Sequence, residues 1–252
     1  MSKLSDAIRR SGRTAPAPLG FAARVISAAA TPTVLCIVRL NSNDANKAEE
    51  AAKKGADAVI IEGGDAGRVK DFAKKVPGLI LGVRPQKAER EQITSLRDAG
   101  ADFVVLDAES AMADALLEEN IGFILLARSD ADDTRLRLLS DLNLDAIVPP
   151  SPDGALTIER LLEFRRFSAL GRTPLLVEVS GDAEASSVQA LRESGVAGVI
   201  IEGSSLGKLE KLRAAIAALP PRRRMREERR EVSIPAPAIA GHDHDDDDFD
   251  DD

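Results

Sequence analysis

Residues 175–206 read LLVEVSGDAEASSVQALRESGVAGVIIEGSSL and contain a strand, a helix and a second strand. The run Leu175–Val179 is a short apolar strand. In the helix that follows, Val188 and Leu191 recur at a helical spacing, and the pattern stops before Gly195, which ends a helix at low cost in the left-handed conformation. A β-branched run then forms the second strand, so the stretch predicts one βαβ unit.

Small residues follow both strands of this unit. Ser180 and Gly181 follow the first strand, and Gly203, Ser204 and Ser205 follow the second and lead into another helix. Small residues at the start of a helix let backbone N–H groups face an anion, which the helix dipole also favours. We therefore expect these five residues to bind a phosphate group.

This spacing resembles the last quarter of the phosphate-binding (β/α)8 barrels, the superfamily of phosphoribosylanthranilate isomerase and indole-glycerol-phosphate synthase. There, the loop after strand seven carries Ser-Gly, and the turn after strand eight presents Gly and Ser to a substrate phosphate. The resemblance implies the same fold and a small phosphorylated ligand. Indole-glycerol-phosphate synthase has lysines at its strand ends, and none stands at the corresponding positions here, so that reaction is not carried over.

Strands and helices alternate from Thr33 onward with a period of roughly 23 residues. This order predicts βαβ units with a parallel sheet, and eight units close a barrel. The expected strands are Val34–Arg39, Ala58–Glu62, Leu79–Arg84, Phe103–Asp107, Phe123–Arg128, Ala146–Pro149, Leu175–Val179 and Gly198–Glu202. The expected helices are Asn46–Lys54, Gly67–Lys75, Lys87–Ala99, Ala111–Glu119, Asp132–Asp141, Thr157–Leu170, Ala183–Ser194 and Leu206–Leu219.

An internal repeat favours a closed barrel over an open sheet. The segment GADAVIIEG at 55–63 recurs as GVAGVIIEG at 195–203, as GADFVVLD at 100–107 and as NLDAIV at 143–148. These are the even-numbered strands, whereas three odd-numbered strands end in arginine. A unit of two strands and two helices, repeated four times, suits the alternate-strand layers of a barrel interior. We therefore predict a single α/β fold, a (β/α)8 TIM barrel.

Composition limits the other features of the chain. The core must be built from Val, Ile, Leu and Ala, because the 252 residues include seven Phe and no Trp or Tyr. Cys36 is the only cysteine, so no intrachain disulfide forms, and we interpret it as a small core residue. No apolar run is long enough to span a bilayer, and no signal peptide precedes the strands, so we expect a cytoplasmic protein without a membrane partner.

The domain boundaries that we predict are an N-terminal arm at 1–31, the barrel at 32–219 and a disordered tail at 220–252, rich first in Arg and then in Asp. The arm begins with a short amphipathic helix, Lys3–Arg10, expected to lie across a barrel end or a partner subunit. Eight Asp fall within Gly241–Asp252, so the rest of the chain, with 34 acidic and 34 basic side chains, is formally neutral. We expect a basic protein partner for the tail, no nucleic acid, and an oligomer as an open alternative.

Charged residues alternate at the ends of the first five strands, where barrels of this kind bind ligands. They are Arg39, Glu62, Arg84, Asp107 and Arg128. One interpretation is a ring of ion pairs that braces neighbouring strands. In the other, the three arginines bind an anion through paired hydrogen bonds, while Glu62 or Asp107 serves as a catalytic acid or base.

Glu178 is the most informative single residue, because it interrupts an apolar strand two residues before Ser180 and so shares its face. A carboxylate there must pair or shift its pKa upward, and such groups collect at functional sites. We expect it to be the general base, or else the partner of Arg39 or Arg128. By the repeat alignment it lies in one layer with Gly82, which would leave room for it or for a ligand.

Two residues oppose an anion beside the glycine-serine turns, Asp182 and Glu202. Glu202 would be neutralised if it turned toward Arg39, which neighbours it only in a closed barrel.

Three functions from different classes agree with this sequence. The first is an enzyme of the isomerase or lyase type that acts on a small phosphorylated metabolite by acid–base chemistry, without a cofactor. The second is a non-catalytic binding or scaffold barrel that works through its arm and tail. The third is a flavin enzyme with FMN, because GADAVIIEGGDAG at 55–67 also resembles the nitronate monooxygenases. We expect no metal site, and interpret His242 and His244 as part of a solvated tail.

Overall fold

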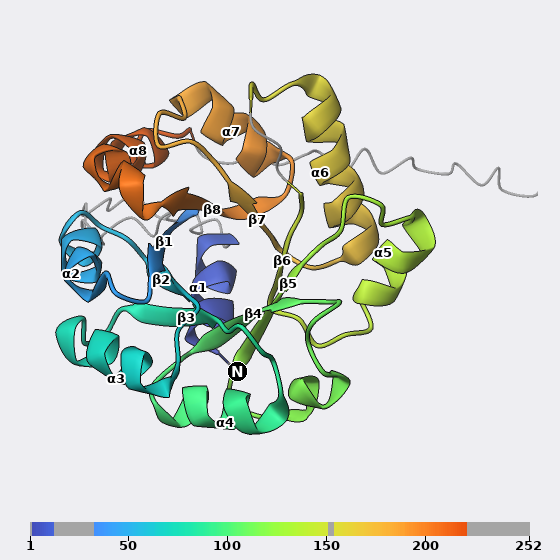
Figure 1. Cartoon of the computed structure of the whole chain (residues 1–252). Coiled ribbons are helices and arrows are strands. Elements are labelled where there is room, and N and C mark those ends of the chain that lie inside the picture. The colour runs from blue at the N-terminus through green and yellow to red at the C-terminus, as the bar shows by residue number, and fades with distance from the viewer. Residues whose placement is uncertain (1, 13–32, 151–153, 221–252) are drawn as a thin grey trace, which may run out of the picture. The chain divides into compact units, whose positions relative to one another are not determined.

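The computed structural model describes residues 2–12, 33–150 and 154–220, and its eight parallel strands close into a barrel in chain order (Figure 1). The first and last strands, β1 and β8, pair in parallel, so the predicted closed (β/α)8 barrel is confirmed. Most of the predicted C-terminal tail lies outside the described residues. The strands are β1 Leu35–Asn41, β2 Ala58–Glu62, β3 Ile80–Arg84, β4 Phe103–Asp107, β5 Gly122–Leu126, β6 Ala146–Val148, β7 Leu175–Glu178 and β8 Val196–Glu202.

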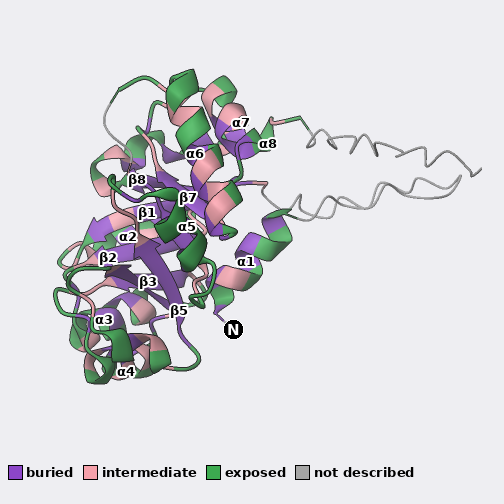
Figure 2. Ribbon diagram, turned by 90° about the vertical axis from the view of Figure 1, so that its right-hand side faces the viewer, coloured by how far each residue is buried: buried purple, intermediate pink, exposed green. Residues whose placement is uncertain are grey.

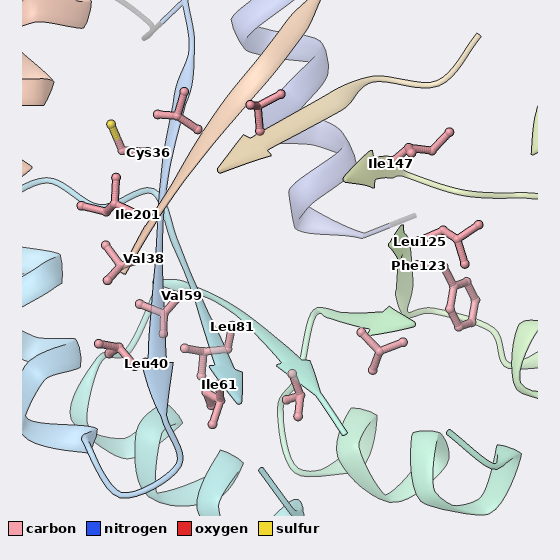
Figure 3. Close-up of a cluster of buried hydrophobic side chains, with 14 of the residues drawn as sticks. Cys36, Val38, Leu40, Val59, Ile61, Leu81, Phe123, Leu125, Ile147 and Ile201 are labelled. Atoms are coloured by element: carbon pink, nitrogen blue, oxygen red, sulfur yellow. The ribbon is translucent and has the colours of Figure 1, made fainter. Parts of the chain in front are cut away.

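Helices surround the barrel and bury the outward faces of the strands, as parallel sheets require. Figure 3 shows part of this outer core, with Cys36, Val38 and Leu40 contributed by β1. Several helices begin at a side chain that caps a backbone N–H, as Asp65, Asp132 and Thr157 do. The elements are α2 Ala45–Lys53, α3 Ala66–Lys75, α4 Arg90–Asp98, the 3₁₀ helix η1 Ala113–Leu117, α5 Asp133–Leu139, α6 Ile158–Gly171, α7 Ala185–Glu193, the 3₁₀ helix η2 Gly203–Lys208 and α8 Leu209–Ala217.

A further helix, α1 (Lys3–Gly12), closes the N-terminal end of the barrel. Its Leu4, Ala7 and Ile8 are buried in one cluster with the inward-facing residues of the strands. Lys3 forms a 2.9 Å ion pair with Asp102 before β4, and Ser2 donates a hydrogen bond to Asp145 before β6. Of the two positions that the sequence left open for the arm, this helix therefore occupies the barrel end; residues 13–32 lie outside the described part of the chain.

The strand register places one ring of side chains just inside the C-terminal mouth. Arg39 pairs in register with Ile60, and Glu178 with Ile200. With the one-residue offset per strand of an eight-stranded barrel, Arg39, Arg84, Leu126 and Glu178 come to one level. The repeat alignment had put Glu178 level with Gly82, which was wrong by one layer.

Two elements differ from the helices that the sequence predicts. The segment 111–119 forms only η1, because Ala111 still pairs with Ala88 as extended chain and Met112 donates its N–H to the Ala88 carbonyl at 2.9 Å. Asn120 then turns the chain with a φ of 62°, which leaves five residues for a helix. The last predicted helix is divided into η2 and α8, so a short extra helix stands directly after β8.

Candidate functional site

A cavity of about 570 Å³ opens at the C-terminal ends of β7 and β8. Ser180, Ser204 and Ser205 line it together, as the sequence predicts, with Glu178 and Arg39 beside them. Its wall also includes Arg160 and Ser187, from α6 and α7. The cavity therefore combines hydroxyl groups, two guanidinium groups and several carboxylates.

The loops after β7 and β8 touch each other, which explains two of the glycines. A Cβ atom on Gly181 would lie 2.8 Å from the Cβ of Ser205, so only glycine lets the loops approach this closely. A Cβ atom on Gly203 would lie 2.6 Å from the Leu40 side chain and 3.0 Å from the Arg39 carbonyl oxygen. Neither glycine is among the residues that line the cavity, and both permit close packing beside it.

Asp182 and Glu202, the two acidic residues that would repel an anion beside the glycine-serine turns, both have cationic partners. Lys208 of η2 forms an ion pair with Asp182. Arg39 forms a 3.3 Å ion pair with Glu202, which is the orientation that the sequence analysis required. The sequence analysis missed Lys208, although a lysine three residues after Ser205, in the segment that leads into the last helix, was a signal for a cation near the glycine-serine turn.

Arg39 is the centre of an ion-pair network. Its guanidinium group donates to Glu178 and lies 3.5 Å from the Glu62 carboxylate, in addition to Glu202. Its side chain is 18% exposed, whereas Glu178 and Glu202 are 40% and 59% exposed, so water reaches these pairs from the carboxylate side. The ion pairs of Arg39 and Arg84 with Glu62 form part of the bracing ring of one of our two interpretations, and Arg39 is engaged by three carboxylates.

Glu62 stands between Arg39 and Arg84, whose guanidinium is 3.7 Å away. Burial raises the pKa of its carboxyl above the ordinary value, while the two arginines lower it and the neighbouring Glu202 and Glu178 raise it again. A carboxyl with a raised pKa retains a proton at higher pH than an exposed one, as general acids do.

A second cavity of about 420 Å³ lies over β2, β3 and β4. It contains Glu62, Arg84 and Asp107, together with Gln86 and Ser110. Asp107 accepts a 3.0 Å hydrogen bond from the backbone N–H of Glu109. The catalytic residues proposed from the sequence are therefore divided, with Glu178 in the first cavity and Glu62 and Asp107 in the second.

Arg128 does not join Arg39 and Arg84. Strand β5 ends at Leu126, two residues earlier than the repeat alignment predicts, so Arg128 lies in the following loop. There it pairs with Glu109 and, at 2.8 Å, with Asp130. Arg128 lines neither cavity. The repeat relates the strands to one another, whereas the loops that follow them differ from strand to strand.

Gly82 serves packing inside the barrel. A Cβ atom at this position would overlap the ring of Phe103, which is fully buried. The glycine therefore makes room for Phe103, and the expectation that it makes room for Glu178 or a ligand was wrong.

The described residues contain no group of three or more His, Cys, Asp or Glu side chains placed to hold a metal ion. His242 and His244 lie outside that part of the chain. Burial raises the pKa of the Cys36 thiol to about 11, so at neutral pH it is a protonated core residue. Among the helices of the described residues, none is long and apolar enough to cross a membrane.

Comparison with known proteins identifies the fold and no family. No family model matches the sequence, and no curated protein matches it. Among solved structures, a mutant tryptophan synthase alpha-subunit from Pyrococcus furiosus superposes with a TM-score of 0.56 at 15% identity, over 72% of this chain and 96% of that one. KGPDC from Streptococcus mutans gives 0.57 at 13% identity, over 73% and 97%. A protein from Aquifex aeolicus VF5 gives 0.59 at 11% identity, over 86% and 96%.

Proposed function

We propose that this barrel binds a small phosphorylated metabolite in the cavity at β7 and β8 and acts on it by acid–base chemistry of the isomerase or lyase type. The phosphate group would lie against Ser180, Ser204 and Ser205, at the start of η2. In barrels of this fold, the loops after strands seven and eight and a short extra helix frequently form a phosphate site. The solved structures named above share this fold with the chain. The similarity is one of fold alone, so the phosphate site is argued from the residues of this chain.

One observation carries the proposal. Three serines from two loops line one cavity, and the two carboxylates that stand beside them in the same loops are held by cations, Asp182 by Lys208 and Glu202 by Arg39. Hydroxyl and N–H donors at such a point form hydrogen bonds to a charged acceptor, which are about twice as strong as neutral ones.

Within this proposal, Glu178 is the general base, because it lines the same cavity as the serines. Arg39 orients its carboxylate by the hydrogen bond between them. Glu62 is the general acid, since burial raises its pKa; it lines the second cavity and shares Arg39 with Glu178, so it acts on the part of the substrate that reaches that cavity. Asp107 remains a candidate for contacts to the part of a substrate that enters the second cavity.

Phosphate binding is tested by calorimetric titration of inorganic phosphate and glycerol phosphate into the protein and two variants. A Gly203→Asp variant is unsuitable, because any side chain there meets Leu40 and the Arg39 backbone. Ser204 is exposed and lines the cavity, so Ser204→Asp adds a negative charge at the site without disturbing the core. Ser95→Asp adds the same charge on the exposed face of α4 and is the matched control.

We expect wild type and Ser95→Asp to bind at millimolar concentration or below, and Ser204→Asp to bind at least tenfold more weakly, about 1.4 kcal/mol. Equal affinity in all three proteins, or no binding by wild type, rejects the phosphate site and leaves the scaffold function. Once a substrate is known, Glu178→Gln should lower kcat by about 10² to 10⁴ with an unchanged circular dichroism spectrum. Normal turnover by that variant would make Glu178 a purely structural partner of Arg39.

A further inference from the structure

The second cavity adjoins the first across the ion pair of Arg39 and Glu62. Arg39 lines the first cavity and Glu62 the second, and the two side chains are 3.5 Å apart. Each cavity also reaches the interior of the barrel, because Ile200 in the first and Val105 in the second belong to the same buried cluster. Figure 2 shows the barrel from the side, with α1 at the end opposite these cavities. A ligand that begins at the serines can therefore continue into the second cavity.

Arg84 has hydrogen-bond donors available to a ligand. Arg39 and Arg128 are engaged by three and two carboxylates. Within the described residues, Arg84 forms one ion pair, at 3.7 Å to Glu62, which is too long for a hydrogen bond. Its side chain is 39% exposed and lines the second cavity. The N–H groups of its guanidinium are therefore free to donate to a ligand in that cavity.

The polar groups of the second cavity combine donors with acceptors. Arg84 supplies donors only, whereas the carboxyl groups of Glu62 and Asp107 supply acceptors. The Gln86 amide and the Ser110 hydroxyl supply both. A hydroxyl group of a ligand likewise donates one hydrogen bond and accepts others. A chain of hydroxyl groups therefore matches this lining.

The charges of this cavity do not favour a second anionic group. Two carboxyl groups and one guanidinium line it, and even with Glu62 protonated the charges of Arg84 and Asp107 cancel. Arg128 lies near enough to Asp107 to attract it, but two other carboxylates already hold this arginine. A carboxylate or phosphate at the far end of a ligand would therefore meet Asp107 with no surplus cation to offset the repulsion.

We propose that the second cavity binds a neutral chain of hydroxyl groups, so that the ligand is an open-chain sugar phosphate or polyol phosphate with one anionic end. This inference rests on the proposed function, which places the phosphate at Ser204 and Ser205 after β8. Strand β2, which ends at Glu62, is two strands from β8, or about 10 Å at the spacing of neighbouring strands. An extended six-carbon polyol phosphate also spans about 10 Å, since three bonds of an extended chain cover about 3.8 Å.

Calorimetric titration of four phosphate compounds into the full chain tests this inference. Inorganic phosphate and glycerol phosphate measure binding at the first cavity. Glucitol 6-phosphate adds the chain of hydroxyl groups, and 6-phosphogluconate is its matched control, because a carboxylate replaces the terminal CH₂OH group. We expect glucitol 6-phosphate to bind at least tenfold more tightly than glycerol phosphate, and 6-phosphogluconate to bind at least tenfold more weakly than glucitol 6-phosphate.

Variants with shortened polar side chains test the second cavity itself. Ser110→Ala and Gln86→Ala each remove hydrogen-bonding groups at exposed positions that line it. Each should weaken the binding of glucitol 6-phosphate by about three- to tenfold. Inorganic phosphate, which is too short to reach them, is the reference ligand. Ser95→Ala, on the exposed face of α4, is the matched control and should bind all four compounds as wild type does.

A further variant tests the exclusion of a second anion. Asp107→Asn removes a negative charge and keeps an oxygen that accepts from the Glu109 N–H. It should reduce the preference for glucitol 6-phosphate over 6-phosphogluconate at least threefold. Asp71→Asn, on the exposed part of α3, removes the same charge away from the cavity and should leave that preference unchanged.

The outcomes distinguish this inference from the proposed function. If wild type binds none of the four compounds, the phosphate site fails, and the inference fails with it. The phosphate site stands and the inference is overturned if glucitol 6-phosphate binds no more tightly than glycerol phosphate, or if 6-phosphogluconate binds as tightly as glucitol 6-phosphate. Unchanged binding of glucitol 6-phosphate by both Ser110→Ala and Gln86→Ala would overturn it in the same way.

Discussion

Arg39 of β1 and Glu202 of β8 are register partners, and their side chains form a 3.3 Å ion pair across the seam where the barrel closes. The same guanidinium binds Glu178 on β7 and Glu62 on β2. One cation thus joins the first two strands to the last two, directly beside the candidate phosphate site. Arg39 therefore both holds neighbouring strands together and forms part of the wall of the cavity.

Replacement of Arg39 by Met should therefore destabilise the barrel, by about 1 to 2 kcal/mol, because three carboxylates lose their shared cation, while the exposure of Glu178 and Glu202 screens two of the pairs. Arg39 lowers the pKa of the Glu62 carboxyl, so without that cation Glu62 takes up a proton more readily, and the loss should be larger at neutral pH than under acidic conditions. Urea unfolding at both pH values measures it. Lys208→Met, which breaks a more exposed pair, should cost less than about 1 kcal/mol, and an equal loss in both variants would contradict the central role of Arg39.

The Glu62 carboxyl should make the protein less stable as pH rises, which is the opposite of the pH dependence expected for the ion pairs of Arg39. Burial raises the pKa of its carboxyl in the folded protein above the unfolded value. For such a group, folding is favoured while the carboxyl is protonated, and stability falls as pH rises from the unfolded to the folded pKa. The neutral variant Glu62→Gln lacks this dependence, so wild type should lose melting temperature relative to Glu62→Gln as pH rises through that window. A difference that is constant with pH would show that the pKa of Glu62 is not raised.

The strand pattern and the internal repeat were sufficient to predict the barrel. Runs such as Val59–Ile61 and Val199–Ile201 consist of β-branched residues and recur at the even-numbered strands. They are buried on both faces, as the strands of a parallel sheet covered by helices are. The pair of Arg39 with Glu202 was the condition set for the phosphate site, because strands one and eight become neighbours only when the barrel closes. For Glu178, Arg39 was one of two partners that the sequence left open, beside a role as general base.

The roles of Gly82, Arg128 and the segment after Ala111 could not be predicted from the repeat. They depend on side-chain packing and on the paths of individual loops, which differ between repeats. Gly82 was expected to leave room for Glu178 or a ligand, because its neighbour in space, Phe103, is 21 residues away in sequence and was not recognised as filling that space. Arg128 was placed at a strand end although β5 stops at Leu126. The extension of the chain at Ala111 toward Ala88, which shortens the following helix, is a tertiary contact that no local pattern predicts.

The acidic segment Gly241–Asp252 lies outside the described residues and remains a sequence-based prediction. We expect its deletion to leave the melting temperature and phosphate affinity unchanged, because it has few apolar groups to bury. Its eight Asp should instead bind a basic probe such as polylysine, in a manner that weakens with salt. Light scattering with polylysine at low and high salt measures this, and a large fall in melting temperature after deletion would show that the segment is docked.

Gly82 and Phe103 give a test of the barrel interior that is independent of any ligand. Because a methyl group on residue 82 overlaps the buried Phe103 ring, Gly82→Ala should destabilise the fold by about 1 to 3 kcal/mol. Phe103→Leu removes part of the ring, and the double variant should be more stable than the sum of the single losses predicts, with a coupling of about 0.5 to 3 kcal/mol. Gly207→Ala, where nothing lies within 4 Å, is the control and should change little. Urea unfolding of all variants measures the cycle, and strict additivity would mean that Phe103 does not occupy the space above Gly82.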